Sequence, residues 1–446
     1  MPAPALDPLD DTATGTTIGV TGAVRRWSVA PWGAVRPWGE GASAVGSLDW
    51  WVAADDRWHR PADEPALRQR RIDGAPVVET RLRVPDGDLV QRVWAVPEGR
   101  STVDGQSTVI VEFENVSPLP VAVAVRGDSI VTERPPASVP IEGIDLPDDT
   151  IVLPIGHHAT VRIALGSISS LPTVPPPLSV VRGWTRVVEQ ASRLVLPDPA
   201  LSEAIVAARC DLLLEGPVDP EIDRIGFLLD VGELVRCGDA AEPWLFEMVG
   251  PAEGLLSARR RGRRRRRSGA DHSLSAEAHD AIAATRRVAA GAGDERAVTD
   301  LDRVLTDVPS VEPGPTVALA DLRRRDADDG DSVGRFVRRV ERRFALDGDL
   351  LPGGIPSAWL GSDFEVHGLP TGADSSVGFA VRWHGERPAV LWEQHGVPRT
   401  LTARSIDAAW ATDAESGEAL WSVPANARVA RRPISFTVEG VTRADG

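Results

Sequence analysis

The chain contains no tyrosine, and all 49 of its basic residues are arginine, so lysine is absent as well. We attribute both absences to a GC-rich coding sequence, because codon bias replaces lysine by arginine wherever a solvated cation suffices. Arginine patterns in this chain are therefore weak indicators of function.

Cysteine is scarce. Cys210 and Cys237 are the only two, and neither has the second nearby pair that a zinc-ligand spacing or a disulfide framework requires. This pattern indicates buried thiols. The histidines also lack a metal-ligand spacing, and no phosphate-binding or dinucleotide-binding glycine motif is present. The sequence predicts no metal and no cofactor.

Long apolar runs are missing too. No stretch approaches the roughly 20 apolar residues that a membrane span needs, and the N-terminus lacks the basic and apolar regions of a signal peptide. We therefore expect a cytoplasmic location and no membrane span. The net charge of -16 disfavours nucleic acid as a partner. A length of 446 residues with 42% hydrophobic content is typical of a globular chain of two or three domains.

The first half of the chain has the pattern of an antiparallel β-sandwich over residues 23–166, after a loose Pro/Ala-rich tail at 1–22. Short runs alternate between apolar and polar residues, and turn residues separate them. Pro85-Asp-Gly-Asp88 is predicted as a hairpin turn. The predicted strands cover residues 77–84, 90–96, 108–115, 121–125, 150–153 and 160–165.

The spacing of the apolar residues then changes from that of strands to that of helices. After a proline-rich linker at 167–179, residues 180–349 show helical spacing. Asp198 and Asp219 each precede a proline and are predicted N-caps. Further helices are predicted at 275–290, 295–305 and 331–346, which gives six or seven in total. Residues 350–440 return to strand patterns and predict a small antiparallel β-domain, with a hairpin over 377–393 and a third strand at 400–403.

Three passages carry a resemblance: Leu196-Pro-Asp-Pro-Ala-Leu201, Glu114-Asn-Val-Ser-Pro-Leu-Pro-Val121 and Phe379-Ala-Val-Arg-Trp-His-Gly-Glu386. With the order of sandwich, helices and small β-domain, they resemble the six-hairpin glycosidase superfamily, which includes glucoamylase-like and debranching-type enzymes, in a shortened actinobacterial form. That resemblance implies an α/α toroid of roughly twelve helices with two catalytic carboxylates. Because the helices number about half of that, we expect an incomplete toroid.

No catalytic residue can be assigned from the resemblance. Asp230 and Glu233 share a helix face at i,i+3, but such a pair is too close and too similarly exposed to act as an acid and base with water between them. We interpret both as solvated helix charges.

Tryptophan clusters near the N-terminus. An indole ring stacks well on a sugar ring, since both are flat and apolar, although tryptophan also fills cores. Trp50 and Trp51 must point to opposite faces of a strand. Trp32 and Trp38, in Pro-Trp-Gly settings, are the best candidates for an exposed platform. The candidate glycan-binding residues are Trp32, Trp38, Trp50, Trp51 and Trp58.

An arginine run between helices is the strongest local charge anomaly. A solvated loop over 257–270 is the favoured interpretation, and an anion-binding site is the alternative. The candidate anion-binding residues are Arg259, Arg260, Arg261, Arg263, Arg264, Arg265, Arg266 and Arg267.

Three functions remain open. The favoured one is a non-catalytic or degenerate glycosidase relative that recognises a glycan or acts as a scaffold. The second is an active glycoside hydrolase or phosphorylase with a shortened helical domain, and the third is an anion-binding interaction protein. Carbohydrate is thus the expected partner, and the sequence does not determine the oligomeric state.

Overall fold

A computed structural model describes residues 15–38, 46–98, 107–137, 146–166, 171, 173–265, 275–307, 332–424 and 426, with the backbone alone at 258–265. It confirms antiparallel sheets in the N-terminal and C-terminal parts and helices between them. The described residues form two compact units. The first unit takes its residues from 1–191, 203–240 and 327–333, and the second from 192–202, 241–326 and 334–446.

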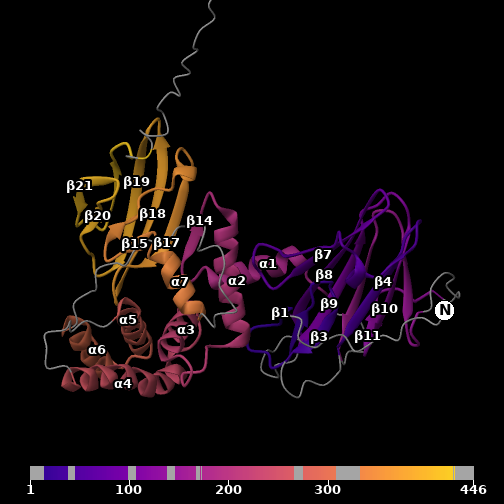
Figure 1. Ribbon diagram of the computed structural model, residues 1–446, viewed down its shortest axis with the longest axis horizontal. Coiled ribbons are helices and arrows are strands. Elements are labelled where there is room, and N and C mark those ends of the chain that lie inside the picture. Colours follow the sequence, from indigo (N-terminus) through magenta and orange to yellow (C-terminus); the bar gives the residue numbers. More distant parts are fainter. Residues whose placement is uncertain are drawn as a thin grey trace, which may run out of the picture. The chain divides into compact units, whose positions relative to one another are not determined.

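The first unit contains two antiparallel sheets (Figure 1). One sheet has seven strands, in the order β1 (Thr16–Ile18), β2 (Arg26–Val29), β3 (Val35–Trp38), β4 (Leu48–Ala53), β10 (Val121–Gly127) and β12 (Ile151–Ile155), with β5 (Trp58–His59) paired to β4. The other has six, in the order β11 (Ile130–Thr132), β13 (Thr160–Leu165), β9 (Ser107–Asn115), β8 (Gly87–Pro97), β7 (Val78–Val84) and β6 (Arg68–Arg71).

Both sheets contribute to one apolar core. Alternate residues of each strand point to the same side of a sheet, so Val109, Val111 and Phe113 of β9 are all fully buried. They belong to one cluster with Val123 and Trp50 of the seven-stranded sheet. The shared cluster fixes the register of both sheets, because a slip by one residue would expose an entire apolar row.

The predicted hairpin turn after β7 is confirmed. Val84 pairs with Gly87, which leaves Pro85 and Asp86 as a two-residue loop. Asp86 takes a φ of 58°, a left-handed conformation that aspartate tolerates better than most residues do. Each predicted strand between residues 77 and 165 has a counterpart in β7, β8, β9, β10, β12 or β13.

Helices cover part of the six-stranded sheet of the first unit. They are α1 (Pro177–Val188) and α2 (Pro199–Glu215, in this unit from Glu203), and α3 (Arg224–Arg236) also belongs to this unit. Val181, Trp184 and Val188 of α1 pack in one cluster with Trp94 and Ile110 of the sheet. This second cluster lies on the face of the sheet opposite the shared core, because Trp94 and Ile110 alternate with the core residues Val93 and Val111.

The second unit combines four helices with two further sheets. The helices are α4 (Ala241–Arg265), α5 (Ala276–Gly291), α6 (Glu295–Asp307) and α7 (Val333–Glu341, in this unit from Gly334). In Figure 1, α4, α5 and α6 lie side by side, and α5 contacts both of the others. With α1 to α3 the described residues contain seven α-helices.

One sheet of the second unit has the order β14 (Arg193–Val195), β17 (Phe364–Pro370), β18 (Ser375–His384), β19 (Arg387–Gly396) and β22 (Ser416–Leu420). The other has the order β15 (Ala345–Leu346), β16 (Asp349–Leu350), β20 (Leu401–Ala403) and β21 (Asp407–Thr412). The predicted hairpin is β18–β19, in which His384 pairs with Arg387. The pairing of β16 with β20 is parallel, whereas we expected antiparallel strands only.

Two helix predictions need correction. We placed a helix start at Asp219, but α3 begins at Arg224, and Asp223 is the residue that caps it. Ile222 lies before the helix and is 85% exposed. The linker prediction for 167–179 is wrong at its end, because α1 already begins at Pro177, where a proline in the first turn loses no hydrogen bond.

Candidate functional site

Four of the five candidate tryptophans lie in strands of the seven-stranded sheet, and Trp38, Trp50 and Trp51 divide between its two faces. Trp50 belongs to the shared core, where its ring lies 5.4 Å from that of Phe113. Trp38 and Trp51 occupy the opposite face, because each is an odd number of positions from a core residue of its strand. The expectation that Trp50 and Trp51 face opposite sides of β4 is therefore confirmed.

Trp50 and Trp51 have no free ring surface. Trp50 is 3% and Trp51 6% exposed. Trp51 packs in a small cluster with Ala124 and Val152, and the half-buried Trp58 packs against it. Trp51 and its neighbours stabilise the outer face of the sheet. The rings of Trp50 and Trp51 are both too deeply buried to stack on a sugar.

The backbone of Trp32 supports the core. It lies in the turn between β2 and β3, and its carbonyl oxygen accepts a hydrogen bond of 3.0 Å from Nε1 of Trp50. This bond satisfies the indole N–H of a core tryptophan, which would otherwise be buried without a partner. The side chain of Trp32 is half-buried.

Trp38 keeps the exposed surface that a platform requires. It ends β3 and is 42% exposed. Its partner across the strands is Arg26 of β2, and the guanidinium carbon of Arg26 lies 5.6 Å from the centre of a Trp38 ring. A guanidinium at this distance from an indole face makes a cation–π contact. Among the described residues, Arg26 has no ion-pair partner.

An ion pair lies beside this tryptophan. Nη2 of Arg36 donates a hydrogen bond of 2.6 Å to Oδ1 of Asp49, and Nη1 donates to the carbonyl oxygens of Val35 and Leu48. Arg36 and Asp49 are half-buried and lie on the same face as Trp38. Three hydrogen bonds thus hold Arg36 in one orientation. We name Arg26, Arg36, Trp38 and Asp49 the Trp38 face.

The Trp38 face presents a flat apolar ring with a cation over it, and a fixed carboxylate further along the same side of the sheet. Trp38 was predicted from the sequence as a candidate binding residue, whereas Arg26, Arg36 and Asp49 were not. The signal was present in the strand period, since Arg36 precedes Trp38 by two residues and therefore shares its side of the strand. The pairing of β2 with β3 that brings Arg26 opposite Trp38 could not be read from composition or spacing.

The carboxylates of α3 are not solvated, which corrects our interpretation of Asp230 and Glu233. Both are buried. Oε1 of Glu233 accepts a 2.6 Å hydrogen bond from Nε of Arg209, and Oε2 accepts a 2.7 Å bond from Nη1 of Arg236. Asp230 accepts a bond from the backbone N–H of Val218. Burial is possible because these partners replace the lost water.

The arginine run does not lie wholly in a loop. We expected a loop at 257–270, but the backbone of α4 continues to Arg265. Arginine and alanine are strong helix formers, so the segment after Leu255 extends the helix. Arg266 and Arg267 lie outside the described residues, and the anion-binding role of the run stays a hypothesis.

Both cysteines are buried free thiols, as predicted. Burial raises the pKa of the Cys210 thiol far above its usual value, so Cys210 is not a nucleophile at neutral pH. Within the described part of the chain, no group of three histidine, cysteine or acidic side chains could hold a metal ion. In the same residues, no helix is both long enough and apolar enough to cross a bilayer.

Comparison of the sequence with protein-family models and with curated proteins gives no match.

Proposed function

We propose that the chain is a non-catalytic glycan-recognition protein, a shortened relative of the six-hairpin glycosidases that binds a sugar at the Trp38 face. One observation carries this proposal: Trp38 is a large, exposed aromatic side chain beside the cation of Arg26, which has no ion-pair partner in the described part of the chain. A ligand that covers this ring would gain the free energy of removing its apolar surface from water.

The chemistry of the Trp38 face fits a sugar better than a purely apolar ligand. The ring of Trp38 suits the C–H face of a pyranose, while the carboxylate of Asp49, further along the same side of the sheet, can accept hydrogen bonds from hydroxyls of a second sugar unit. Arg26 adds a donor with a full positive charge, which favours a sugar that carries an acidic substituent. The ion pair with Arg36 holds Asp49 in place before the ligand arrives.

Recognition without hydrolysis is supported by the state of the helix carboxylates. Glu233 already accepts hydrogen bonds from two guanidinium groups, and Asp230 accepts one from the backbone. Neither is available to protonate a glycosidic oxygen. In this proposal the two N-terminal sheets form a β-sandwich that presents the Trp38 face, and the helices derive from an incomplete α/α toroid.

A glycan array with the full chain tests the proposal. The array should contain neutral glycans and glycans with uronic or sialic acids. We expect a restricted set of sugars to bind, and we expect the Trp38→Ala variant to lose at least tenfold in affinity for them, because the stacking surface is removed. The Arg26→Ala variant should lose affinity mainly for the acidic members of that set.

Phe246→Ala is the matched control. Phe246 is an aromatic residue of the second unit that is 85% exposed, so its removal should change neither folding nor sugar binding. The proposal is wrong if no sugar binds, or if Trp38→Ala and Phe246→Ala bind alike. Incubating each bound glycan with the wild-type chain and measuring released reducing ends tests the alternative of an active hydrolase in the same experiment.

A further inference from the structure

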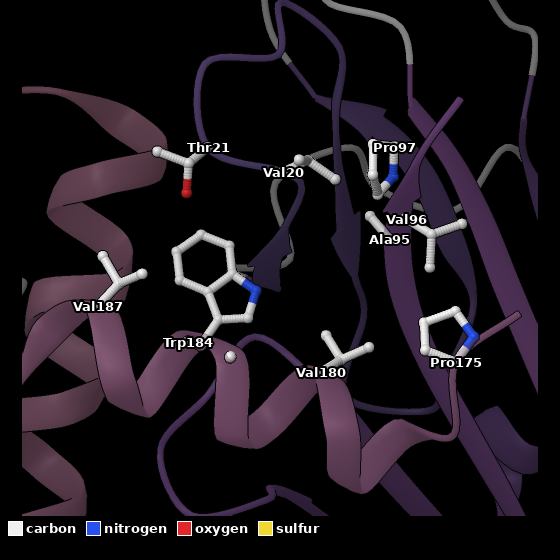
Figure 2. A pocket seen from close by; sticks show the side chains of 10 residues that line it. Val20, Thr21, Ala95, Val96, Pro97, Pro175, Val180, Trp184 and Val187 are labelled. Carbon is white, nitrogen blue, oxygen red and sulfur yellow. The ribbon is translucent and has the colours of Figure 1, made fainter. Parts of the chain in front are cut away.

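The first unit contains a pocket of about 320 Å³, separate from the Trp38 face (Figure 2). Residues of α1 form one side, and the end of β8 and the turn that follows β1 form the other. The lining residues are Val20, Thr21, Ala95, Val96, Pro97, Pro175, Val180, Gly183, Trp184 and Val187. The volume lies within the range of roughly 300 to 1,000 Å³ that is typical of small-molecule sites.

The pocket is lined almost entirely by apolar side chains. No charged residue belongs to the lining, and the hydroxyl of Thr21 and the indole N–H of Trp184 are its only polar side-chain groups. An ion that entered would lose its hydration without gaining a counter-charge, which is strongly unfavourable. The lining therefore selects a neutral, mainly hydrocarbon molecule.

Trp184 supplies one directional contact. Its side chain is 8% exposed, yet its Nε1 donates to no acceptor among the described residues, in contrast to Nε1 of Trp50. Figure 2 shows this nitrogen on the edge of the indole that faces Val20, Ala95 and Val96 across the pocket. Unlike Nε1 of Trp94, this nitrogen is not fully enclosed, so it remains an accessible, unused donor at the pocket.

We propose that this pocket binds a small neutral amphiphile, namely a hydrocarbon chain or ring with one oxygen that accepts a hydrogen bond from Nε1 of Trp184. The apolar body fills the space between α1 and the end of β8. The oxygen satisfies the indole N–H, and the hydroxyl of Thr21 lies on the same side of the pocket as the indole in Figure 2.

The helix geometry offers a clean way to block the pocket. Val180, Gly183, Trp184 and Val187 follow the i, i+3, i+4, i+7 spacing of one helix face. A Cβ atom placed on Gly183 meets no heavy atom within 4 Å. Leucine at this position would thus extend into the pocket without a clash, and it is a better helix former than glycine.

Isothermal titration of the full chain with 1-octanol and with octanoate tests the proposal, because the two probes have the same carbon count and differ in charge. We expect 1-octanol to bind and octanoate at pH 7 to bind at least tenfold more weakly. Trp184→Phe removes the donor but keeps an aromatic ring, so it should weaken 1-octanol roughly two- to tenfold, the value of one net hydrogen bond. Gly183→Leu should abolish binding.

Gly250→Leu is the control for Gly183→Leu. Gly250 is a helical glycine of α4 that also has open space around its Cβ position, and it does not line the pocket. It should leave 1-octanol binding unchanged. The proposal is overturned if wild type does not bind 1-octanol, if octanoate binds as tightly, or if Gly183→Leu binds like Gly250→Leu. Thermal melting of each variant shows whether a loss of binding reflects unfolding.

Discussion

Glu233 has an environment unlike that of an ordinary helix carboxylate. It lies in α3, and the guanidinium groups of Arg209 and Arg236 bind its two oxygens. Arg209 is only 1% exposed. Two buried charges of opposite sign stabilise each other only as long as both are present. Removing one leaves the other without water and without a counter-charge.

Glu233→Ala should therefore lower the free energy of unfolding by about 3 to 5 kcal/mol, the range measured when one partner of a buried pair is deleted. Urea denaturation followed by far-UV circular dichroism measures this. Glu203→Ala, at an exposed position of α2, should change the value by less than about 0.5 kcal/mol. Equal urea midpoints for Glu233→Ala and Glu203→Ala would show that the ion pairs of Glu233 do not stabilise the folded chain.

Trp38 shows what a single-residue argument can and cannot predict. Its residue type and turn setting indicated an exposed aromatic, and it is exposed. Trp50 has the same residue type and is buried, because strand parity turns it toward Phe113. Composition cannot distinguish these cases. The distinction requires the register of β3 against β4, which places Val35 opposite Leu48.

Among the helices, α3 is the element for which local signals conflict. Asp219-Pro220 and Asp223 both resemble N-caps, four residues apart. In the structure the carboxylate of Asp223 accepts a 3.0 Å hydrogen bond from the N–H of Gly226, so it is the cap. Asp219 instead accepts from the N–H of Glu221, which makes it part of a preceding turn.

Asp223→Ala should lower the free energy of unfolding by about 1 kcal/mol, because the first turn of α3 loses its side-chain acceptor. Asp219→Ala is the matched comparison, and it should cost clearly less because the turn is exposed and water can replace the carboxylate. Chemical denaturation of the two variants under identical conditions measures both. A larger loss for Asp219→Ala would contradict the assigned helix start.

Strand periods predicted the elements better than they predicted the connections. The alternation in β9 and the turn at Pro85-Asp86 are local, so both were visible in the sequence. The short strands β1 to β6 were not predicted, because they are stabilised by pairing and not by their own pattern. The pocket could not be predicted either, since it joins α1 to the end of β8, about 80 residues earlier in the chain.

A row of alternating charges crosses five strands of the six-stranded sheet. Each residue lies directly opposite the next in the strand register, which is the arrangement that stabilises cross-strand pairs. Glu79 and Glu112 are buried, whereas the arginines retain some exposure. The row consists of Arg70, Glu79, Arg92, Glu112 and Arg162.

For the whole chain, acid pH sets two electrostatic effects against each other. Protonation reduces the net charge of -16 and so weakens the repulsion between acidic groups, which favours the folded state. The same protonation removes carboxylates that the folded chain uses. Asp56 belongs to this second group, because its hydrogen bond with His59 holds the pKa of the carboxyl below its ordinary value. Which effect is larger decides how the chain responds to acid.

A substitution at Glu79 can distinguish the loss of a stabilising carboxylate from the change in overall charge repulsion. Burial alone would raise the pKa of Glu79, but hydrogen bonds and charges from Arg81 and Arg92 outweigh it, so the pKa lies below its ordinary value of 4.5. A carboxyl with a lowered folded pKa binds fewer protons when folded than when unfolded. Its contribution to stability is therefore complete above pH 4.5 and is lost as the pH falls through the folded pKa.

We expect Glu79→Gln to lower the free energy of unfolding by about 2 kcal/mol at pH 7, the order of a hydrogen-bonded charge. The difference from wild type should shrink as the pH falls from 5 to 3, because the wild-type carboxyl becomes neutral like the amide. Urea midpoints measured at each pH give this difference, and the change in overall charge repulsion cancels between the two proteins. A difference that is the same at pH 7 and pH 3 would show that Glu79 stabilises the sheet by packing and not by its charge.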